Sequence, residues 1–364
     1  MRPNRKARGS DEAARLDSLV YSRSRYQEMK PGQSFRAATP DEALEWQKQA
    51  RARLWELIGG LPSDATRVAL NPRYGKPVRR PGYTRTPVTF TTRPDLDAFA
   101  YFLVPDGLKP LEQRPAILCL PGHGRGVDDI VGMNADGSER DHHDGYQHDF
   151  AVQCVERGYV VLALEMLGFG HRRDEAARTE GAGSSSCQPA AGAALLLGET
   201  MAGWRTWDAS CALDLLQSRP EVDGGKLGLI GISGGGTVGL YTAALDRRVQ
   251  AAVLSCSFCT YRDSIFSVSH CIDNYVPGML RSFEMADVAA MIAPRGLFCE
   301  NGSQDDIFPE AGAREAFQKV QASYTRFSPS DRAVLEVNEG GHQFYGNGAF
   351  EALRKWLGDP IQDD

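Results

Sequence analysis

The segment GLIGISGGGTVG, residues 228–239, sets one serine among glycines at the end of an apolar run. Ser233 lies in a Gly-x-Ser-x-Gly pattern, in which a sharp strand-to-helix turn exposes the serine hydroxyl. A phosphate-binding loop would need a lysine after the glycines, and none follows. A dinucleotide fingerprint would lie on the first strand of its unit, whereas this segment lies late in the chain. The pattern favours a nucleophilic serine, with a plain glycine-rich turn as the alternative.

Two histidines follow Ser233 in the chain, and one of them is well placed to act as its base. A serine hydroxyl is a weak nucleophile, so it needs an adjacent base that is itself oriented by an acid. His342, in NEGGHQFYG, comes directly after an expected strand, whereas His270, in VSHCIDNYVPG, lies in an irregular segment. We therefore predict His342 as the base and His270 as a group that lines the substrate site.

The acid should end another strand between the serine and the histidine, because the partners of such a serine follow in that order. The segment LFCENGSQDDIFP offers two adjacent candidates, Asp305 and Asp306, after Gly302. Acids in a loop are ordinarily turn formers or solvated charges. Their place after a strand favours one of the two as the orienting acid.

Attack on a carbonyl also needs hydrogen-bond donors for the oxyanion that develops. The N–H of Gly234, directly after the serine, is one candidate, because it opens the following helix. The second donor should come from the loop after an early strand, LCLPGHGRG. We assign it to the backbone N–H of Arg125, and we expect His123 to shape this loop and to line the substrate site.

Segments from about residue 115 to 345 together resemble the acetyl-xylan-esterase-like and dienelactone-hydrolase-like branch of the α/β-hydrolases. The resemblance implies Ser233, Asp305 and His342 as the catalytic triad of a carboxylic-ester hydrolase. Dienelactone hydrolases proper use a cysteine nucleophile, so their activity is not implied for a chain with a serine at this place. The pieces that match are LPGHGRG, GFGHRR, GISGGG, AALDRRVQAAVLS, HCIDNYVPG, IAPRGLF, NGSQDDIFP and EGGHQF.

These residues predict an esterase that works through an acyl-enzyme on short-chain, acetyl-type esters, with esters of sugars as one option. An amidase or peptidase, a carbon–carbon hydrolase with the same triad, and a non-catalytic binding module stay open as alternatives. The mechanism requires no metal and no organic cofactor. The expected partner is a small-molecule ester, without nucleic acid or membrane, and a homo-oligomer is an open option.

Several other polar groups could serve chemistry but have simpler explanations. The segment RDHHDGYQHD (residues 140–149) matches no metal-ligand spacing and is typical of a polar loop that enters a helix. Cys256-x-x-Cys259 could hold zinc, yet Cys256 falls in an expected buried strand, where free cysteine is often a small core residue. Arg172, after GFG, lies near the expected mouth of the site and is a candidate for substrate binding.

The composition is that of an ordinary globular protein, with 42% hydrophobic and 24% charged residues. A net charge of −6 at pH 7 argues against general affinity for nucleic acid. No apolar stretch approaches the ~20 residues of a membrane span. The first thirty residues are basic and lack the apolar core of a secretory signal, and the eight cysteines are scattered. We therefore expect reduced thiols and a cytoplasmic protein.

Alternating strands and helices must position these residues, and they predict an α/β-hydrolase fold with a mostly parallel sheet covered on both faces. Thr39-Pro40-Asp41-Glu42 should open a helix, and Ser233 should end a strand over 226–233. We expect a flexible basic tail over 1–38 and one catalytic domain over 39–364. Within the domain we expect a helical extension over 39–95 and insertions at the rim of the site over 171–196 and 259–283.

Overall fold

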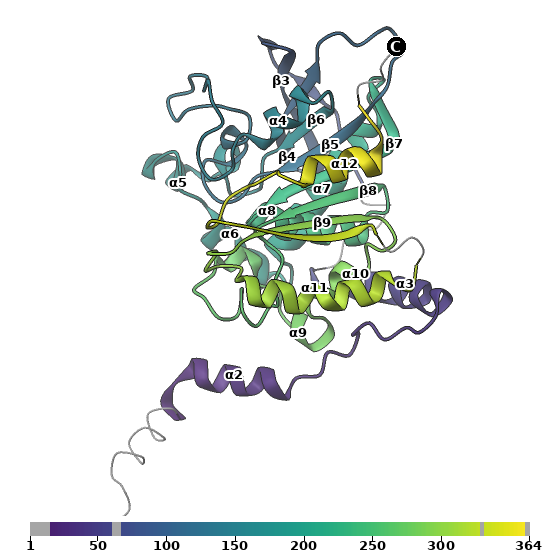
Figure 1. Ribbon diagram of the computed structural model, residues 1–364. Coiled ribbons are helices and arrows are strands. Elements are labelled where there is room, and N and C mark those ends of the chain that lie inside the picture. Colours follow the sequence, from purple (N-terminus) through teal and green to yellow (C-terminus); the bar gives the residue numbers. More distant parts are fainter. Residues whose placement is uncertain (1–14, 60–66, 328–330, 361–364) are drawn as a thin grey trace, which may run out of the picture.

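The computed structural model describes residues 15–59, 67–327 and 331–360. These residues form one large sheet with helices on both of its faces (Figure 1). The expected doubly covered, mostly parallel α/β architecture is therefore confirmed.

The sheet runs in the order β1-β3-β4-β6-β5-β7-β8-β9-β10, with β2 paired to β3 outside this path. The six strands from β6 to β10 in this order are parallel, and the pairs that involve β1 to β4 are antiparallel. Their bounds are β1 Arg73–Tyr74, β2 Val78–Arg80, β3 Tyr83–Arg93, β4 Leu96–Pro105, β5 Arg114–Leu120, β6 Val160–Leu164, β7 Val222–Ile232, β8 Val249–Ser255, β9 Gly296–Gly302 and β10 Ala333–Asn338.

Two apolar layers hold the helices against the sheet. One layer joins the sheet to α3, α7, α8, α10 and α11, and the other joins it to α4 and α12. The α-helices are α2 Ser18–Glu28, α3 Pro40–Leu57, α4 Phe150–Glu156, α5 Glu175–Glu180, α6 Cys187–Leu196, α7 Met201–Gln217, α8 Gly234–Leu245, α9 Met279–Ser282, α10 Met285–Ala290, α11 Glu310–Tyr324 and α12 Ala349–Leu357. Short 3₁₀ helices are η2 Gly126–Asp129, η3 Gly170–Arg172 and η4 Ile272–Asn274.

The start of α3 is the one that the sequence predicts. Thr39 accepts the N–H of Glu42 at 3.2 Å, and Glu42 in turn accepts the N–H of Thr39 at 3.3 Å. Pro40 occupies the first turn, where its missing N–H costs nothing. The reciprocal cap fixes this end of the helix, and α3 packs its apolar face on the sheet layer that also holds α8 and α10.

The N-terminal third differs from expectation. Among the described residues of the predicted helical extension over 39–95, α3 is the helical part, because residues 73–93 form β1, β2 and the long strand β3. Buried and half-exposed residues alternate along β3 with the period of a strand, although Pro87 lies within it. The predicted tail over 1–38 contains helix α2, and its first 14 residues lie outside the described part of the chain.

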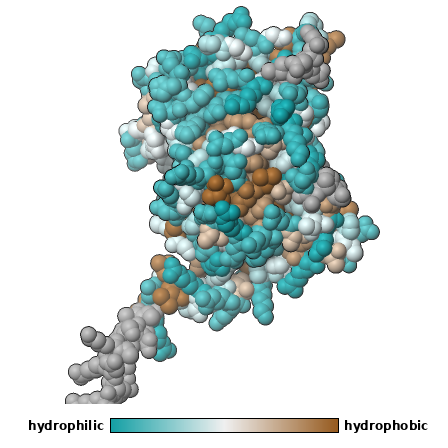
Figure 2. All heavy atoms as spheres, viewed as in Figure 1, coloured by the Kyte–Doolittle hydropathy of each residue, from teal (hydrophilic) through white to brown (hydrophobic). Residues whose placement is uncertain are grey.

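Helix α2 lies apart from the main body at the lower left of Figure 1. No residue of α2 is buried, and Leu19 and Val20 are exposed. Figure 2 shows hydrophobic atoms in brown on the surface of this segment, apart from the main body. Its C-terminal end is held to the body where the Tyr26 hydroxyl donates to Glu284 at 2.8 Å. Within the described ranges, no helix is both long and apolar enough to cross a membrane.

Candidate active site

Ser233 lies at the sharp turn between β7 and α8, with φ 54° and ψ −123°. A non-glycine residue rarely adopts this backbone conformation, and such strain is typical of functional turns. The turn closes tightly, because a Cβ on Gly231 would lie 2.3 Å from the carbonyl oxygen of Gly235, and one on Gly235 would lie 2.2 Å from that of Leu120. The glycines two before and two after the serine are therefore required by the backbone itself.

His342 and Asp305 meet above the carboxyl ends of β10 and β9. His342 Nδ1 lies 2.8 Å from Asp305 Oδ2, while Oδ1 of the same carboxylate accepts the N–H groups of Ile307 at 2.9 Å and Phe308 at 3.1 Å. Burial would raise the pKa of Asp305, but the hydrogen bond from His342 and the two N–H groups hold that pKa below its ordinary value. The structure thus brings Asp305, and not the exposed Asp306, beside His342.

Two aromatic rings fix the plane of the His342 imidazole. Tyr146 stacks on it at 5.8 Å between ring centroids, and Phe308 stacks at 6.0 Å. The His342 side chain is 18% exposed, so one edge of the ring stays open to solvent. A ring held in this way presents its free Nε2 in a fixed direction.

Ser233 and His342 line one cavity of about 360 Å³ above the sheet. Its wall includes residues 268–271 from the insertion predicted at the rim of the site, together with the loops after β5 and β9. The lining residues are His123, Tyr146, Ser233, Val268, Ser269, His270, Cys271, Asp306, Ile307 and His342. A cavity of this size fits a small ligand.

The predicted oxyanion donors divide into one that fits and one that is wrong. Gly234 is the first residue of α8, and its N–H has no acceptor among the described residues. The Arg125 N–H is already engaged, because it donates to Asp129 at 2.9 Å, and Arg125 does not line the cavity. The N–H of His123 has no acceptor in the described chain, and His123 does line the cavity with Ser233. The second donor is therefore better assigned to His123.

Of the three residues predicted to bind substrate, two line the cavity. His123 and His270 both lie in its wall, and burial lowers the pKa of His270. Arg172 does not reach it, because its guanidinium pairs with the buried carboxylate of Asp208 at 2.7 Å and its side chain is only 6% exposed. The position of Arg172 in the loop after GFG predicted a place near the mouth of the site. The side chain instead points inward and pairs with Asp208 of α7.

Several residues of the site carried no local signal in the sequence. The Tyr146 hydroxyl donates to the carbonyl oxygen of His123, and Gln147 accepts the N–H of Gly122 at 2.8 Å, so both hold the loop after β5. Behind His123, Asp273 of η4 pairs with Arg205 of α7 in the interior. Directly after Gln147, His148 and Asp149 both adopt positive φ, so the chain turns sharply beside Tyr146 and Gln147.

Among the residues that the structure describes, two clusters of acids, thiols and imidazoles lie close enough together to be considered as metal sites, and neither suits a cation. In the group of Cys256, Asp305 and His342, both carboxylate oxygens are already used by hydrogen bonds. In the group of His123, Cys187 and Asp273, the Arg205 guanidinium occupies the carboxylate and also donates to the thiol at 3.1 Å. A positive charge in that place opposes binding of a second one.

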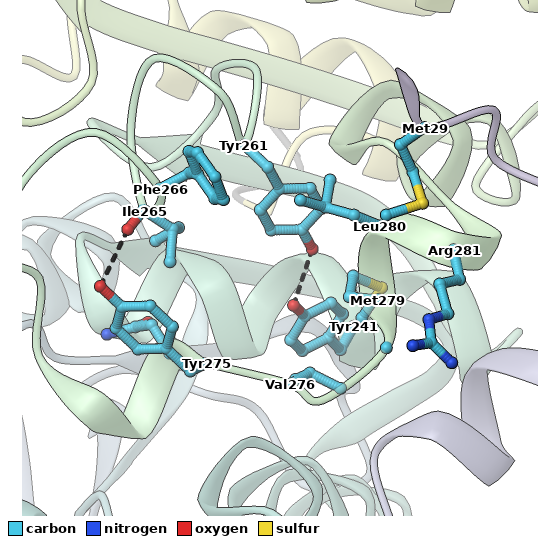
Figure 3. A pocket seen from close by; sticks show the side chains of 12 residues that line it. Met29, Tyr241, Tyr261, Ile265, Phe266, Tyr275, Val276, Met279, Leu280 and Arg281 are labelled. Atoms are coloured by element: carbon cyan, nitrogen blue, oxygen red, sulfur yellow. Dashed lines mark hydrogen bonds between the residues drawn. The ribbon is translucent and has the colours of Figure 1, made fainter. Parts of the chain in front are cut away.

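A second cavity of about 240 Å³ lies on the other part of the same insertion, between residues 265–281 and α8 (Figure 3). Its wall is apolar, and the Tyr241 and Tyr261 hydroxyls at its base are bonded to each other at 2.8 Å. The Tyr275 hydroxyl likewise donates to the carbonyl oxygen of Ile265 at 3.0 Å. This cavity contains none of the predicted catalytic residues, so the candidate active site is the one at Ser233.

The order of the strands, the sharp turn at Ser233 and the pair of Asp305 and His342 together define a protein of the α/β-hydrolase fold. The chain belongs to the Abhydrolase family, which matches residues 10–324. It is 30% identical over 268 residues to YtaP of Bacillus subtilis (strain 168), a protein named as a candidate hydrolase; the match covers 71% of this chain and 83% of that protein.

Solved structures share the fold at lower identity. One is a candidate acetyl xylan esterase from Bacteroides fragilis NCTC 9343, with a TM-score of 0.75 and 20% identity, covering 89% of this chain and 82% of that one. Another is a glucuronoyl esterase from Solibacter usitatus, with a TM-score of 0.64 and 16% identity, covering 87% of this chain and 93% of that one. These likenesses concern the fold.

Proposed function

We propose that this protein is a carboxylic-ester hydrolase in which Ser233 is the nucleophile, His342 the base and Asp305 the orienting acid. The observation that carries the proposal is the 2.8 Å contact between His342 and Asp305, because His342 lines the same cavity as the strained elbow of Ser233. A serine and a base in one small cavity, with an acid hydrogen-bonded to the base, are the components of acyl transfer to water.

In the first half of the reaction, Ser233 Oγ attacks the ester carbonyl while His342 Nε2 takes the hydroxyl proton. The oxyanion of the tetrahedral intermediate receives the N–H groups of Gly234 and His123. His342 then gives its proton to the departing alkoxide, the carbon–oxygen bond breaks, and an acyl-serine ester and a free alcohol result. Asp305 holds the ring by Nδ1 and stabilises the imidazolium while it carries the proton.

In the second half, His342 takes a proton from water, and the hydroxide that forms attacks the acyl-serine carbonyl. The same two N–H groups receive the second oxyanion. The intermediate collapses as His342 returns the proton to Ser233 Oγ, which releases the carboxylic acid. The residues present account for every proton transfer, and the cycle leaves the protein unchanged.

The size of the cavity and the name of the candidate acetyl xylan esterase support a short acyl group. A volume of about 360 Å³, with Val268 and Ile307 as its apolar side chains, suits an acetyl or a similarly small acyl chain better than a long one. The structures that share the fold include a candidate acetyl xylan esterase and a glucuronoyl esterase, both named for esters of sugars. We propose short-chain esters, acetylated sugars among them, as the substrate class.

The test is turnover of p-nitrophenyl esters of rising chain length, beside acetylated sugars, by the wild type and Ser233→Ala. We expect the acetyl ester to be preferred and the variant to lose on the order of 10⁶ in kcat. A fluorophosphonate probe should label Ser233 alone, and Ser138→Ala, at an exposed loop serine, serves as the matched control. Activity retained by Ser233→Ala, or labelling of another serine, would overturn the proposal.

A further inference from the structure

His123 places a second imidazole in the active-site cavity, against the residue that follows the nucleophile. A Cβ on Gly234 would lie 3.0 Å from Nδ1 and Cε1 of His123, so the bare glycine is what lets the ring come this close. The ring also packs on Phe169, with 4.6 Å between ring centroids. The His123 side chain is 25% exposed, and it is exposed toward the cavity that it lines.

The other edge of the ring faces a buried carboxylate. Nε2 of His123 lies 3.2 Å from Oδ2 of Asp273, an ion-pair distance, although the N–H bond is not aligned for a hydrogen bond. The Asp273 side chain is fully buried. It comes from η4 in the insertion over 259–283, whereas His123 comes from the loop after β5, so the pair joins the insertion to the sheet.

Asp273 is shared with a second cation. Arg205 of α7, whose side chain is 1% exposed, forms an ion pair with the same carboxylate oxygen. Its remaining donors go to the carbonyl oxygen of Leu167 and the thiol of Cys187, so Asp273 is its only carboxylate among the described residues. The guanidinium also lies over the Phe169 ring at 4.5 Å.

The groups that face His123 favour its charged form. Burial alone would lower the pKa of His123, but Asp273 and the thiols of Cys187 and Cys271 raise it to about 11. On the cavity side, burial and the charges of His123 and His342 lower the pKa of the neighbouring His270. When His123 is protonated, both His123 and Arg205 carry a positive charge beside the single negative charge of Asp273. The group of three then has a net charge of +1, and His123 is its member that lines the cavity.

Neither acid near the cavity pairs with His123. Asp306 lines the cavity, but it is exposed to solvent, which screens its charge, and Asp305 lies behind His342 with both oxygens in hydrogen bonds. A fixed cation in a partly dehydrated cavity attracts an anion far more strongly than one on an open surface does. The missing counter-charge would be supplied by whatever occupies the cavity.

We infer that the imidazolium of His123 binds a negatively charged substituent, such as a carboxylate, on the ester that this protein hydrolyses. The inference rests on the proposed esterase function and deepens it, because it names the charge of the substrate. His123 has two roles in this account: its backbone N–H receives the oxyanion, and its side chain selects an acidic ester.

The test compares esters that differ only in charge. One pair is the p-nitrophenyl ester of succinic acid and the same ester with the second carboxyl methylated, which varies the acyl part. The other pair is 4-acetoxybenzoate and its methyl ester, which varies the alcohol part. At low ionic strength we expect the charged member of at least one pair to have a kcat/KM about tenfold higher, the size of one charge-assisted contact.

His123→Gln should reduce that ratio to about one, and high salt should reduce it in the wild type. The ratio is the readout because a uniform loss of activity does not change it. His142→Gln, at an exposed histidine outside the cavity, should leave the ratio as it is. No preference for the charged member in either pair, or a preference that His123→Gln retains, would overturn the inference.

Binding separates this inference from the esterase proposal. Calorimetric titration of Ser233→Ala with the same pairs measures affinity without turnover, and the double variant with His123→Gln is its control. If no ester is hydrolysed but charged esters bind about tenfold tighter and lose this advantage in the double variant, the cation site stands and the esterase proposal fails. Equal binding of charged and neutral esters contradicts the cation site, whatever the turnover.

Discussion

Two histidine–aspartate pairs face one cavity, and they differ in what surrounds the acid. Asp305, beside His342, is satisfied by two backbone N–H groups and has a single imidazole partner at 2.8 Å. Asp273, beside His123, also serves the buried guanidinium of Arg205. Asp305 and His342 are neutral as a pair only when His342 gains a proton. Asp273 is already balanced by Arg205, so a protonated His123 adds an excess positive charge.

The comparison teaches that residue types alone do not decide the role of such a pair. An acid held by N–H groups orients an imidazole and leaves it free to exchange protons with a nucleophile. A fully buried acid, together with two neighbouring thiols, raises the pKa of the second imidazole, so that His123 keeps its proton. One pair is therefore suited to proton transfer and the other to binding.

The largest effect should come from breaking the first pair at its acid. Asp305→Asn leaves an oxygen for the N–H groups of Ile307 and Phe308 but removes the charge that selects the His342 tautomer. We expect kcat to fall by about 10⁴, the size seen for this change in the chymotrypsin-type example. Thermal unfolding should change little. Turnover within tenfold of wild type would show that Asp305 does not orient the base.

Breaking the second pair at its acid should act mainly on stability. Asp273→Asn leaves the buried Arg205 charge without a carboxylate, which typically costs about 3–5 kcal/mol in the free energy of unfolding. Arg205→Met in the same chain removes the orphaned charge, so the double variant should recover part of the loss in denaturant unfolding. A double variant that is less stable than Asp273→Asn would contradict this account of the network.

The charge of His123 should appear in the pH dependence of stability. Its pKa is about 11 in the folded chain and about 6.5 ordinarily, so folding retains a proton that the unfolded chain releases. This contribution is fully present below about pH 6.5 and is lost as the pH rises toward about 11. The melting temperature of the wild type relative to His123→Gln should therefore fall steadily from pH 6 to pH 9, as followed by circular dichroism. A constant difference would mean that His123 is neutral.

The smallest effect is expected at the acid next to the triad. Asp306 is exposed, and α11 begins only at Glu310 with Pro309 as its N-cap, so Asp306 does not cap that helix. Asp306→Asn should change stability by no more than about 0.5 kcal/mol and leave kcat on a neutral ester within about twofold. Inactivation by Asp306→Asn, with Asp305→Asn active, would reverse the assignment of the acid.

Local patterns indicated the candidate residues that lie at strand ends. Ser233 and His342 each follow a strand whose apolar run and terminal glycines are visible in the sequence, whereas the choice of Asp305 over Asp306 came from the family resemblance. The Arg125 N–H, predicted as an oxyanion donor, is instead engaged, because Gly124 and Gly126 both adopt positive φ and the Arg125 N–H turns toward Asp129. The sequence near Arg125 does not determine the φ angles of these two glycines.

The second histidine–aspartate pair could not be predicted in the same way. His123, Arg205 and Asp273 are far apart in the chain and come from a loop, a helix and an insertion. No spacing rule connects them, and each has a plain explanation when considered alone. Strands β1–β3 were missed for a related reason, since their pairing with β4 is decided by the rest of the sheet.

The origin of Asp273 in the insertion over 259–283 has a consequence for how this protein could diversify. The proposed triad lies in loops of the sheet, so it would survive replacement of the insertion, whereas Asp273, which holds the proposed cation, would be lost with the insertion. Chemistry and selectivity are thus carried on separable modules of one chain. Exchange of a single segment between relatives would be a route to enzymes that share a reaction and differ in the charge of the molecules they accept.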